Sequence, residues 1–277
     1  MEQVKFQKVE LKPEDKRLQE NLARIKNKVI ILSGKGGVGK STVSTNVARG
    51  LVAKGKKVGI LDVDIHGPSI AKMLGIEGRT LMLMQGEEFP MPVKVEENLW
   101  ALTIAILLKD QDEPIIWRGP LKIGAIKQFL QDIKWPELDY LIIDSPPGTG
   151  DEPLTVAQTM KVNGSIIVST PQDIALLDAR KTINFSTKMN IPVIGLVENM
   201  STFICPHCGH EIDIFKGMGV QKAAEDFNLD ILGKIPLDPK IVQSGDNGVS
   251  IFSSEFQDSV IRKEYEKIAE KVIAKLG

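Results

Sequence analysis

The stretch Gly34-Lys35-Gly36-Gly37-Val38-Gly39-Lys40-Ser41 decides the fold, because it satisfies the pattern G-x-x-x-x-G-K-S/T between an expected strand and an expected helix. Its glycines let the backbone turn tightly enough for successive N–H groups to face phosphate oxygens, and the helix start adds partial positive charge. We expect Lys40 to reach the β- and γ-phosphate oxygens, Ser41 to ligate Mg²⁺, and Thr42 to join the nucleotide contacts. A glycine-rich turn that binds nothing is the weaker interpretation.

Around this loop, apolar runs of strand length alternate with segments of helical period. This alternation predicts an α/β fold, a mostly parallel twisted sheet with helices on both faces. The expected strands are residues 28–33, 57–62, 99–104, 138–144, 165–170, 192–198 and 231–235, and the expected helices are residues 40–54, 121–133, 174–189, 220–227 and 256–276.

The composition fits one packed domain at residues 28–277, which follows an N-terminal arm at residues 1–27. Leu18, Leu22 and Ile25 have helical spacing in the arm, so we expect either a helix on the domain or a partly ordered segment. Residues 79–95 and 200–219 interrupt the alternation and are expected to be surface insertions, the first a short hairpin or loop.

Charge and hydropathy exclude several classes of partner. Lys plus Arg (35) nearly equal Asp plus Glu (36), which leaves a net charge of -1 and no global field toward nucleic acid. The longest apolar run, residues 99–108, is much shorter than the ~20 residues of a membrane-spanning helix. The N-terminus is charged where a signal peptide is apolar. We therefore expect a cytoplasmic protein with neither a membrane nor a nucleic acid partner.

Two acidic strand ends supply the other groups that nucleotide hydrolysis needs. Asp144 ends an apolar strand and is expected to hold Mg²⁺ through water, while the following turn, Ser145-Pro146-Pro147-Gly148-Thr149-Gly150, senses the γ-phosphate as a switch. One of Asp62 and Asp64 is expected to orient the attacking water, and we favour Asp64. Acids at strand ends also cap helices or face solvent, which is the alternative for both.

The base is expected to be adenine. An Asn-Lys-x-Asp motif for guanine does not follow the loop, so ATP is favoured over GTP. Asn199, at the end of an expected strand, can offer its amide to the adenine edge, and Pro236 can flank the ring. Turn stabilisation is the alternative role for both residues.

The cysteine pair Cys205-Pro-His-Cys208 supplies two of the four ligands that tetrahedral zinc and iron-sulfur centres require. A two-fold symmetric dimer would complete the set from two identical pairs. Geometry alone leaves a bridging 4Fe-4S cluster and zinc both open, with a disulfide or an inert pair as further alternatives. His66, His207 and His210 are weaker candidates as additional ligands.

Lys35 makes the loop look like the deviant Walker A subgroup of P-loop proteins, the MinD/ParA-like (SIMIBI-like) superfamily. From about residue 28 to the C-terminus, the chain resembles the Mrp/ApbC-type iron-sulfur cluster carrier ATPases through Asp62-Val63-Asp64-Ile65-His66-Gly67-Pro68-Ser69, Trp117-Arg118-Gly119-Pro120, Asp144-Ser145-Pro146-Pro147-Gly148-Thr149-Gly150-Asp151, Thr170-Pro171-Gln172 and Cys205-Pro-His-Cys208.

The resemblance implies a homodimeric ATPase, slow without a partner, that accepts a 4Fe-4S cluster from a donor and passes it to apo-proteins. In this interpretation Cys205 and Cys208 hold the cluster, and Lys35 crosses the dimer interface onto the partner's nucleotide. Compared with some members of this family, we expect the chain to have neither an extra N-terminal domain nor an N-terminal cysteine cluster. It also has Ser145 where many relatives carry an apolar residue.

Two other functions remain open. One is a MinD/ParA-like spatial organiser that binds membrane or DNA and carries structural zinc at the cysteines. An apolar stripe on the C-terminal helix fits that reading, although such stripes more often dock on the core: Ile261, Tyr265, Ile268, Val272 and Leu276. The other is an ATP-gated reductase like the nitrogenase iron protein, which the closely spaced cysteines disfavour.

Overall fold

The computed structural model describes residues 13–64, 67–103, 106, 119–205 and 207–277. Within these ranges the strands form one sheet in the order β3-β4-β2-β5-β1-β6-β7-β8, and β9 also pairs with β7. Their bounds are β1 (Ile25–Leu32), β2 (Val58–Asp62), β3 (Val93–Glu96), β4 (Leu99–Thr103), β5 (Leu138–Asp144), β6 (Gly164–Ser169), β7 (Val193–Ile204), β8 (Glu211–Ile212) and β9 (Ile231–Leu237).

The sheet is mostly parallel, which confirms the expected fold class. Strand β1 lies between β5 and β6 and is parallel to both, and β2, β4, β7 and β9 continue the parallel pairing. Only β3 and β8 pair antiparallel, each at the margin of the described sheet. Because the parallel strands point the same way, the loops after β1, β2 and β5 meet at one edge of the sheet.

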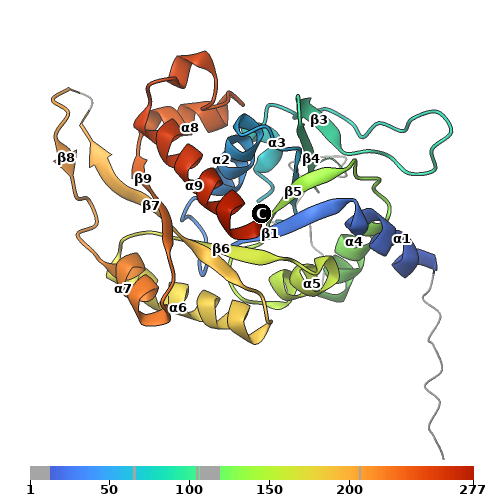
Figure 1. Ribbon diagram of the computed structural model, residues 1–277, viewed down its shortest axis with the longest axis horizontal. Coiled ribbons are helices and arrows are strands. Elements are labelled where there is room, and N and C mark those ends of the chain that lie inside the picture. The colour runs from blue at the N-terminus through green and yellow to red at the C-terminus, as the bar shows by residue number, and fades with distance from the viewer. Residues whose placement is uncertain (1–12, 65–66, 104–105, 107–118, 206) are drawn as a thin grey trace, which may run out of the picture.

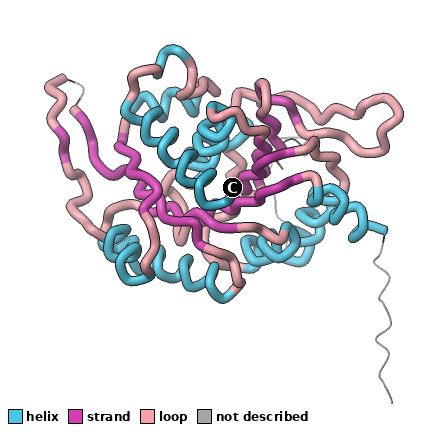
Figure 2. Tube along the Cα trace, in the orientation of Figure 1, coloured by secondary structure: helices cyan, strands magenta, loops and turns pink. Residues whose placement is uncertain are grey.

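Helices cover both faces of this sheet (Figures 1 and 2). On one face α2 and α9 bury their apolar sides in a common core, and on the other face α1, α4 and α5 share a core while α6 and α7 share another. The helices are α1 (Pro13–Ala23), α2 (Lys40–Ala53), α3 (Ile70–Met73), α4 (Gly119–Gln131), α5 (Asp151–Met160), α6 (Asp173–Lys188), α7 (Gly219–Phe227), α8 (Pro239–Asp246) and α9 (Val260–Leu276).

The N-terminal arm differs from expectation at its end. Helix α1 packs on the domain through the buried Leu18, as expected, but it ends at Ala23. Ile25 is the first residue of β1 and is buried beside Leu138, so it belongs to the sheet rather than to a helical stripe.

Three helices were not expected: α3, α5 and α8. Helix α5 begins with two acids and carries Pro153 in its first turn, which are features of a helix start, and its buried residues Pro153, Val156, Ala157 and Met160 have helical spacing, so the signal was present in the sequence. Strand β7 also continues to Ile204, six residues beyond the expected strand, and the insertion at residues 200–219 therefore begins as a hairpin with β8.

The apolar stripe of α9 faces the core. Ile261, Tyr265, Ile268 and Val272 are all buried, and Leu276 packs against the same cluster. In the part of the chain that the structure describes, no helix combines the length and the apolar character of a membrane span.

Candidate nucleotide and cysteine sites

The phosphate loop, residues 34–41, joins the central strand β1 to α2. Gly37 and Gly39 both have φ of 80°, a left-handed conformation that glycine adopts without strain. Gly39 must also lack a side chain, because a Cβ there would lie 2.2 Å from Nδ2 of Asn199. The loop borders a cavity of about 210 Å³ whose lining includes Lys40, Ser41 and Asp64. The loop thus has the shape and the backbone N–H groups to hold a polyphosphate.

A group of buried polar side chains lies beside this cavity. Nζ of Lys40 lies 2.8 Å from Oδ1 of Asp144, and both side chains are almost fully buried. The hydroxyl of Ser41 donates to Oδ2 of Asp144 at 2.6 Å. A hydroxyl beside a carboxylate is a hard oxygen donor set that suits Mg²⁺, so these residues fit the expected ion.

Ser44 belongs to the same group and was missed by sequence reasoning. Its hydroxyl donates to Oδ1 of Asp144 at 2.6 Å, so the carboxylate accepts hydrogen bonds from two serines of α2. The signal was present in the chain, because Ser41 and Ser44 are three residues apart and therefore share one face of the helix.

The two acids after β2 have different environments. Asp62 is fully buried and accepts hydrogen bonds from the Asp64 amide and from the hydroxyl of Thr103, each at 3.0 Å. Burial, together with the neighbouring Asp144 carboxylate, raises the pKa of Asp62 to about 8. Asp64 lines the cavity, and its Oδ2 lies 3.9 Å from Nζ of Lys40. This geometry favours Asp64 over Asp62 as the group that meets water.

The expected base-contact residues lie apart. Nδ2 of Asn199 donates a 2.8 Å hydrogen bond to the Val38 carbonyl, so its amide faces the phosphate loop. Pro236 is buried within β9 and lines a different cavity, outside the set that borders the phosphate loop. Lys35 is half-buried, with Nζ 3.5 Å from Oε1 of Gln172.

The expected switch segment follows β5 and borders the same cavity. The amide of Gly148 donates to the Ser33 carbonyl at 2.8 Å, and Gly148 has φ of 92°. Pro147 lines the cavity itself. Ser145, the departure from the family pattern, is buried and its hydroxyl donates to the Ile31 carbonyl at 2.9 Å. Ser145 and Gly148 are thus hydrogen-bonded to β1 and to the residue that directly follows it.

The cysteines lie at the tip of the β7–β8 hairpin. Both are free thiols, Cys205 half-buried and Cys208 exposed. The Cys205 amide donates to the His210 carbonyl, and the Gly209 amide donates back to the Cys205 carbonyl, both at 2.9 Å. Backbone N–H groups of Cys208 and His207 point at the Cys205 sulfur and hold the pKa of this thiol below its usual value.

This tight turn suits a metal-binding thiolate, but the two cysteines alone do not form a complete set of metal ligands. Among the described residues, no group of three or more His, Cys, Asp and Glu side chains is placed to hold a metal ion. His207 and His210 therefore do not complete a set with the cysteines. His66 and the Trp117-Arg118 pair lie outside the described residues.

The fold and the phosphate loop define a P-loop NTPase of the MinD/ParA-like class. The family model described as "NUBPL iron-transfer P-loop NTPase" matches residues 24–273, so the chain belongs to the iron-sulfur cluster carrier family of these NTPases. An iron-sulfur cluster carrier protein of Methanocaldococcus jannaschii is 46% identical over 96% of this chain and 90% of its own length. A cytosolic Fe-S cluster assembly factor NUBP1 homolog of Caenorhabditis briggsae is 45% identical over 94% of this chain and 84% of its own length.

Solved structures agree with this assignment. A nucleotide-binding protein of Archaeoglobus fulgidus, in complex with ADP, superposes with a TM-score of 0.76 at 37% identity, covering 88% of this chain and 96% of that one. The cell division ATPase MinD of Pyrococcus furiosus has a TM-score of 0.62 at 23% identity, covering 91% of this chain and all of its own, and supports the fold alone.

Proposed function

We propose that the protein is an ATP-dependent carrier that binds a 4Fe-4S cluster between two identical chains and transfers it to apo-proteins in the cytoplasm. The observation that carries this proposal is the pair of free thiols at the hairpin tip, the half-buried Cys205 and the exposed Cys208. The backbone turn stabilises the thiolate of Cys205, and the chain belongs to a family of iron-sulfur cluster carriers. One chain nevertheless offers only two thiolate ligands. Two copies supply four thiolates, the number that a cubane cluster requires.

The phosphate loop binds ATP, and the buried side chains beside the loop carry out its hydrolysis. Lys40 contacts the β- and γ-phosphate oxygens once it exchanges its ion pair with Asp144 for the nucleotide. Ser41 and Asp144 hold Mg²⁺, which neutralises charge on the phosphates. Asp64 orients the attacking water, and Thr42 and Asn199 complete the nucleotide contacts from the cavity wall and β7. Pro236 does not border the phosphate-loop cavity, so its proposed contact is with the adenine ring and not with the phosphates.

The homodimer is supported by apolar side chains beside the phosphate loop. Ile174 is 77% exposed and Leu177 59% exposed on α6, and Met218 is 55% exposed at the start of α7. The backbone of Asp178 on α6 packs directly against Gly34, so this surface adjoins the loop. Closing a second copy over it buries the apolar side chains and brings Lys35 toward the partner's nucleotide.

A labile cluster suits this arrangement. A cluster held by four thiolates from two exposed hairpins stays accessible to solvent and to a client, which favours release over permanent storage. Nucleotide binding reshapes the dimer through the Pro146-Pro147-Gly148 segment, and hydrolysis resets it. The donor of the cluster and the client apo-proteins contact the open side of the hairpins. Turnover is slow until such a partner binds.

Anaerobic reconstitution with iron and sulfide tests the proposal. We expect charge-transfer absorption, one 4Fe-4S cluster per two chains by iron and sulfide assay, and a dimer by light scattering. Replacing Cys205 and Cys208 with alanine should abolish the cluster while ATP binding persists. A monomer that keeps the cluster, a cluster retained without the cysteines, or stoichiometric zinc in place of iron would each overturn it.

A further inference from the structure

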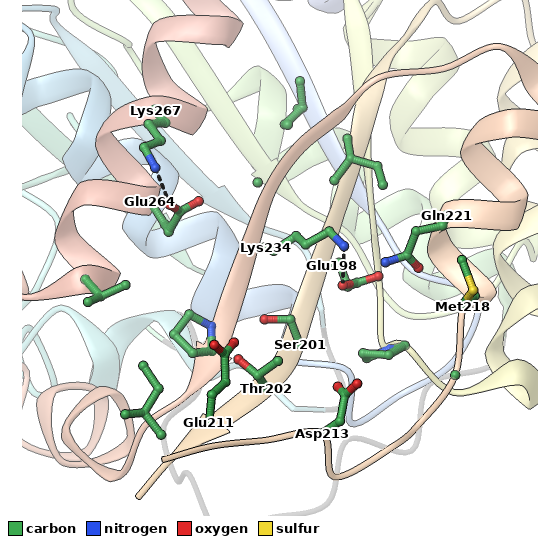
Figure 3. A pocket seen from close by; sticks show the side chains of 18 of the residues that line it. Glu198, Ser201, Thr202, Glu211, Asp213, Met218, Gln221, Lys234, Glu264 and Lys267 are labelled. Carbon is green, nitrogen blue, oxygen red and sulfur yellow. Dashed lines mark hydrogen bonds and ion pairs between the residues drawn. The ribbon is translucent and has the colours of Figure 1, made fainter. Parts of the chain in front are cut away.

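A cavity of about 770 Å³ lies beside the cysteine hairpin, away from the phosphate loop. It runs between α9, β9, the start of α7 and the β7–β8 hairpin, as Figure 3 shows. A second hollow of about 400 Å³ continues it past the start of β9 along α7 and the loop that joins α7 to β9, and Gln221 and Ile231 line both. We call the two together the β9 groove. Its elongated form suits a chain segment better than a compact small molecule.

The backbone beside the groove can accept another strand. Among the described residues β9 pairs only with β7, so its outer edge carries no neighbouring strand. Nζ of Lys271 reaches one carbonyl on this side, that of Ile231, at 2.9 Å. An exposed lysine at the open edge of a sheet commonly prevents unwanted strand pairing, and its side chain can move away when a partner strand binds.

The groove also contains buried acceptors that lack donors. The Glu198 side chain is only 3% exposed, and its Oε2 has no hydrogen-bond partner in the described structure. Oε1 of Gln221 is likewise buried and unpartnered, while the amide of the same side chain faces the Glu198 carboxylate and lowers its pKa. Figure 3 shows the Gln221 side chain, from α7, pointing toward the Glu198 carboxylate on β7 at the wall of the cavity. Buried oxygen acceptors without donors are rare and costly, so a partner that brings N–H groups gains by meeting them.

Charge near these acceptors favours a cationic donor. Oε1 of Glu198 lies 3.4 Å from Nζ of Lys234, and the acids Glu211 and Asp213 line the groove at the same end. Lys234 is half exposed, so its side chain can turn toward solvent and open the carboxylate. Burial raises the pKa of Glu198, and a second cation beside Oε2 stabilises its ionised form.

We propose that an extended segment of a client polypeptide adds to the free edge of β9 and places a basic side chain against Glu198 and Gln221. The inference rests on the proposed carrier function, and it gives the client a docking site next to the hairpin that presents the cluster. Strand addition supplies affinity through main-chain hydrogen bonds, and the basic side chain sets the register.

The test uses a fluorescein-labelled decapeptide of alternating threonine and valine with one central arginine. Its partner peptide carries neutral citrulline instead. We expect the reconstituted protein to bind the arginine peptide about tenfold more tightly in fluorescence anisotropy, close to the effect of one charge-assisted hydrogen bond. Glu198→Gln should remove this difference. Glu264→Gln is the matched control, because that carboxylate lines the same cavity but is already paired with Lys267 at 2.5 Å.

Hydrogen exchange provides the second readout, with slower exchange of the β9 amides when the arginine peptide is bound. Equal affinities for the two peptides, unchanged exchange in β9, or full competition by methylguanidinium would overturn the proposal. So would β9 amides already protected in the dimer without peptide, because a second copy would then occupy the edge. Cluster content and dimerisation are measured in the same samples, so failure of the carrier function is seen separately.

Discussion

The side-chain amide of Asn199 donates a hydrogen bond of 2.8 Å to the carbonyl of Val38, which fastens β7 to the phosphate loop. Cys205 follows six residues further along the chain, directly after β7 ends at Ile204. Between them Met200 has φ of 56°, a left-handed conformation that is strained for a side chain of this kind, and the register with β9 shifts there. One strand therefore links the nucleotide site to the thiolates through a strained residue.

Replacing Asn199 with alanine should loosen this link. Loss of this one buried hydrogen bond costs about 1 kcal/mol, so ATP affinity should fall roughly fivefold. ATP should also change the alkylation rate of Cys205 less than in the unmodified protein. Fluorescent ATP titration and thiol labelling measure the two effects. Asn247→Ala, an exposed change at the end of α8, is the control, and equal behaviour of both variants would contradict the link.

Lys40→Met should weaken ATP binding by about a hundredfold or more, because the lysine is the nearest cation to the phosphate site and a hundredfold corresponds to about 2.7 kcal/mol. Isothermal titration calorimetry measures the change. Lys188→Met removes an exposed lysine at the far end of α6 and should leave binding intact. Near-normal affinity in the first variant would exclude Lys40 from phosphate binding.

Gly34 and Gly36 offer a matched pair in the phosphate loop. A Cβ on Gly34 would lie 2.6 Å from the backbone oxygen of Asp178, whereas a Cβ on Gly36 meets nothing within 4 Å. Forcing a methyl group into such contact costs ~1–3 kcal/mol. We expect Gly34→Ala to lower the free energy of unfolding by this amount and Gly36→Ala to change it little, as urea titration would show. A reversed order would refute the packing argument.

Much of the fold could be predicted because the sheet is buried on both faces, and strands such as β5 are then continuous apolar runs. Helix α5 was missed although the acids and Pro153 in its first turn are features of a helix start, because its apolar stripe is only about two turns long. The extension of β7 was hidden for another reason. Beyond Glu198 its polar and apolar residues show no period, and only pairing with β8, a tertiary contact, keeps the chain extended.

Some residues of the site could likewise be predicted from the sequence, and others could not. The loop and Asp144 follow from motif spacing, since their chemistry requires fixed residue types at fixed positions. The spacing of Ser41 and Ser44 places both on one helix face, but the contact of Ser44 with Asp144 joins residues a hundred positions apart, and local spacing does not show which carboxylate it meets. The unpartnered oxygens of Glu198 and Gln221 are likewise a property of packing that no sequence period encodes.

Stability should depend on pH through Asp62. Its pKa is about 8 in the folded protein and near 3.8 when unfolded, so the folded state holds an extra proton between these values. Stability from this group is therefore complete below pH 4 and is lost as the pH rises through 8, by up to about 1.4 kcal/mol per pH unit. Asp62→Asn removes the titration, so the variant should lose less stability than the unmodified protein between pH 5 and pH 8. The free energy of unfolding is measured by urea titration at each pH. An equal decrease for the two proteins between pH 5 and pH 8 would contradict this prediction.

The two cysteines should react at different rates in the absence of a cluster. The thiolate is the reactive form, and backbone N–H groups of Cys208 and His207 stabilise it at Cys205, where they hold the pKa below its usual value. Iodoacetamide at pH 7 should therefore modify Cys205 several-fold faster in the Cys208→Ser variant than it modifies Cys208 in the Cys205→Ser variant, although Cys208 is the more exposed. Peptide mass spectrometry of quenched samples gives both rates. If exposure alone governed the chemistry, Cys208 would react first, and the turn would have no part in preparing a thiolate for the cluster.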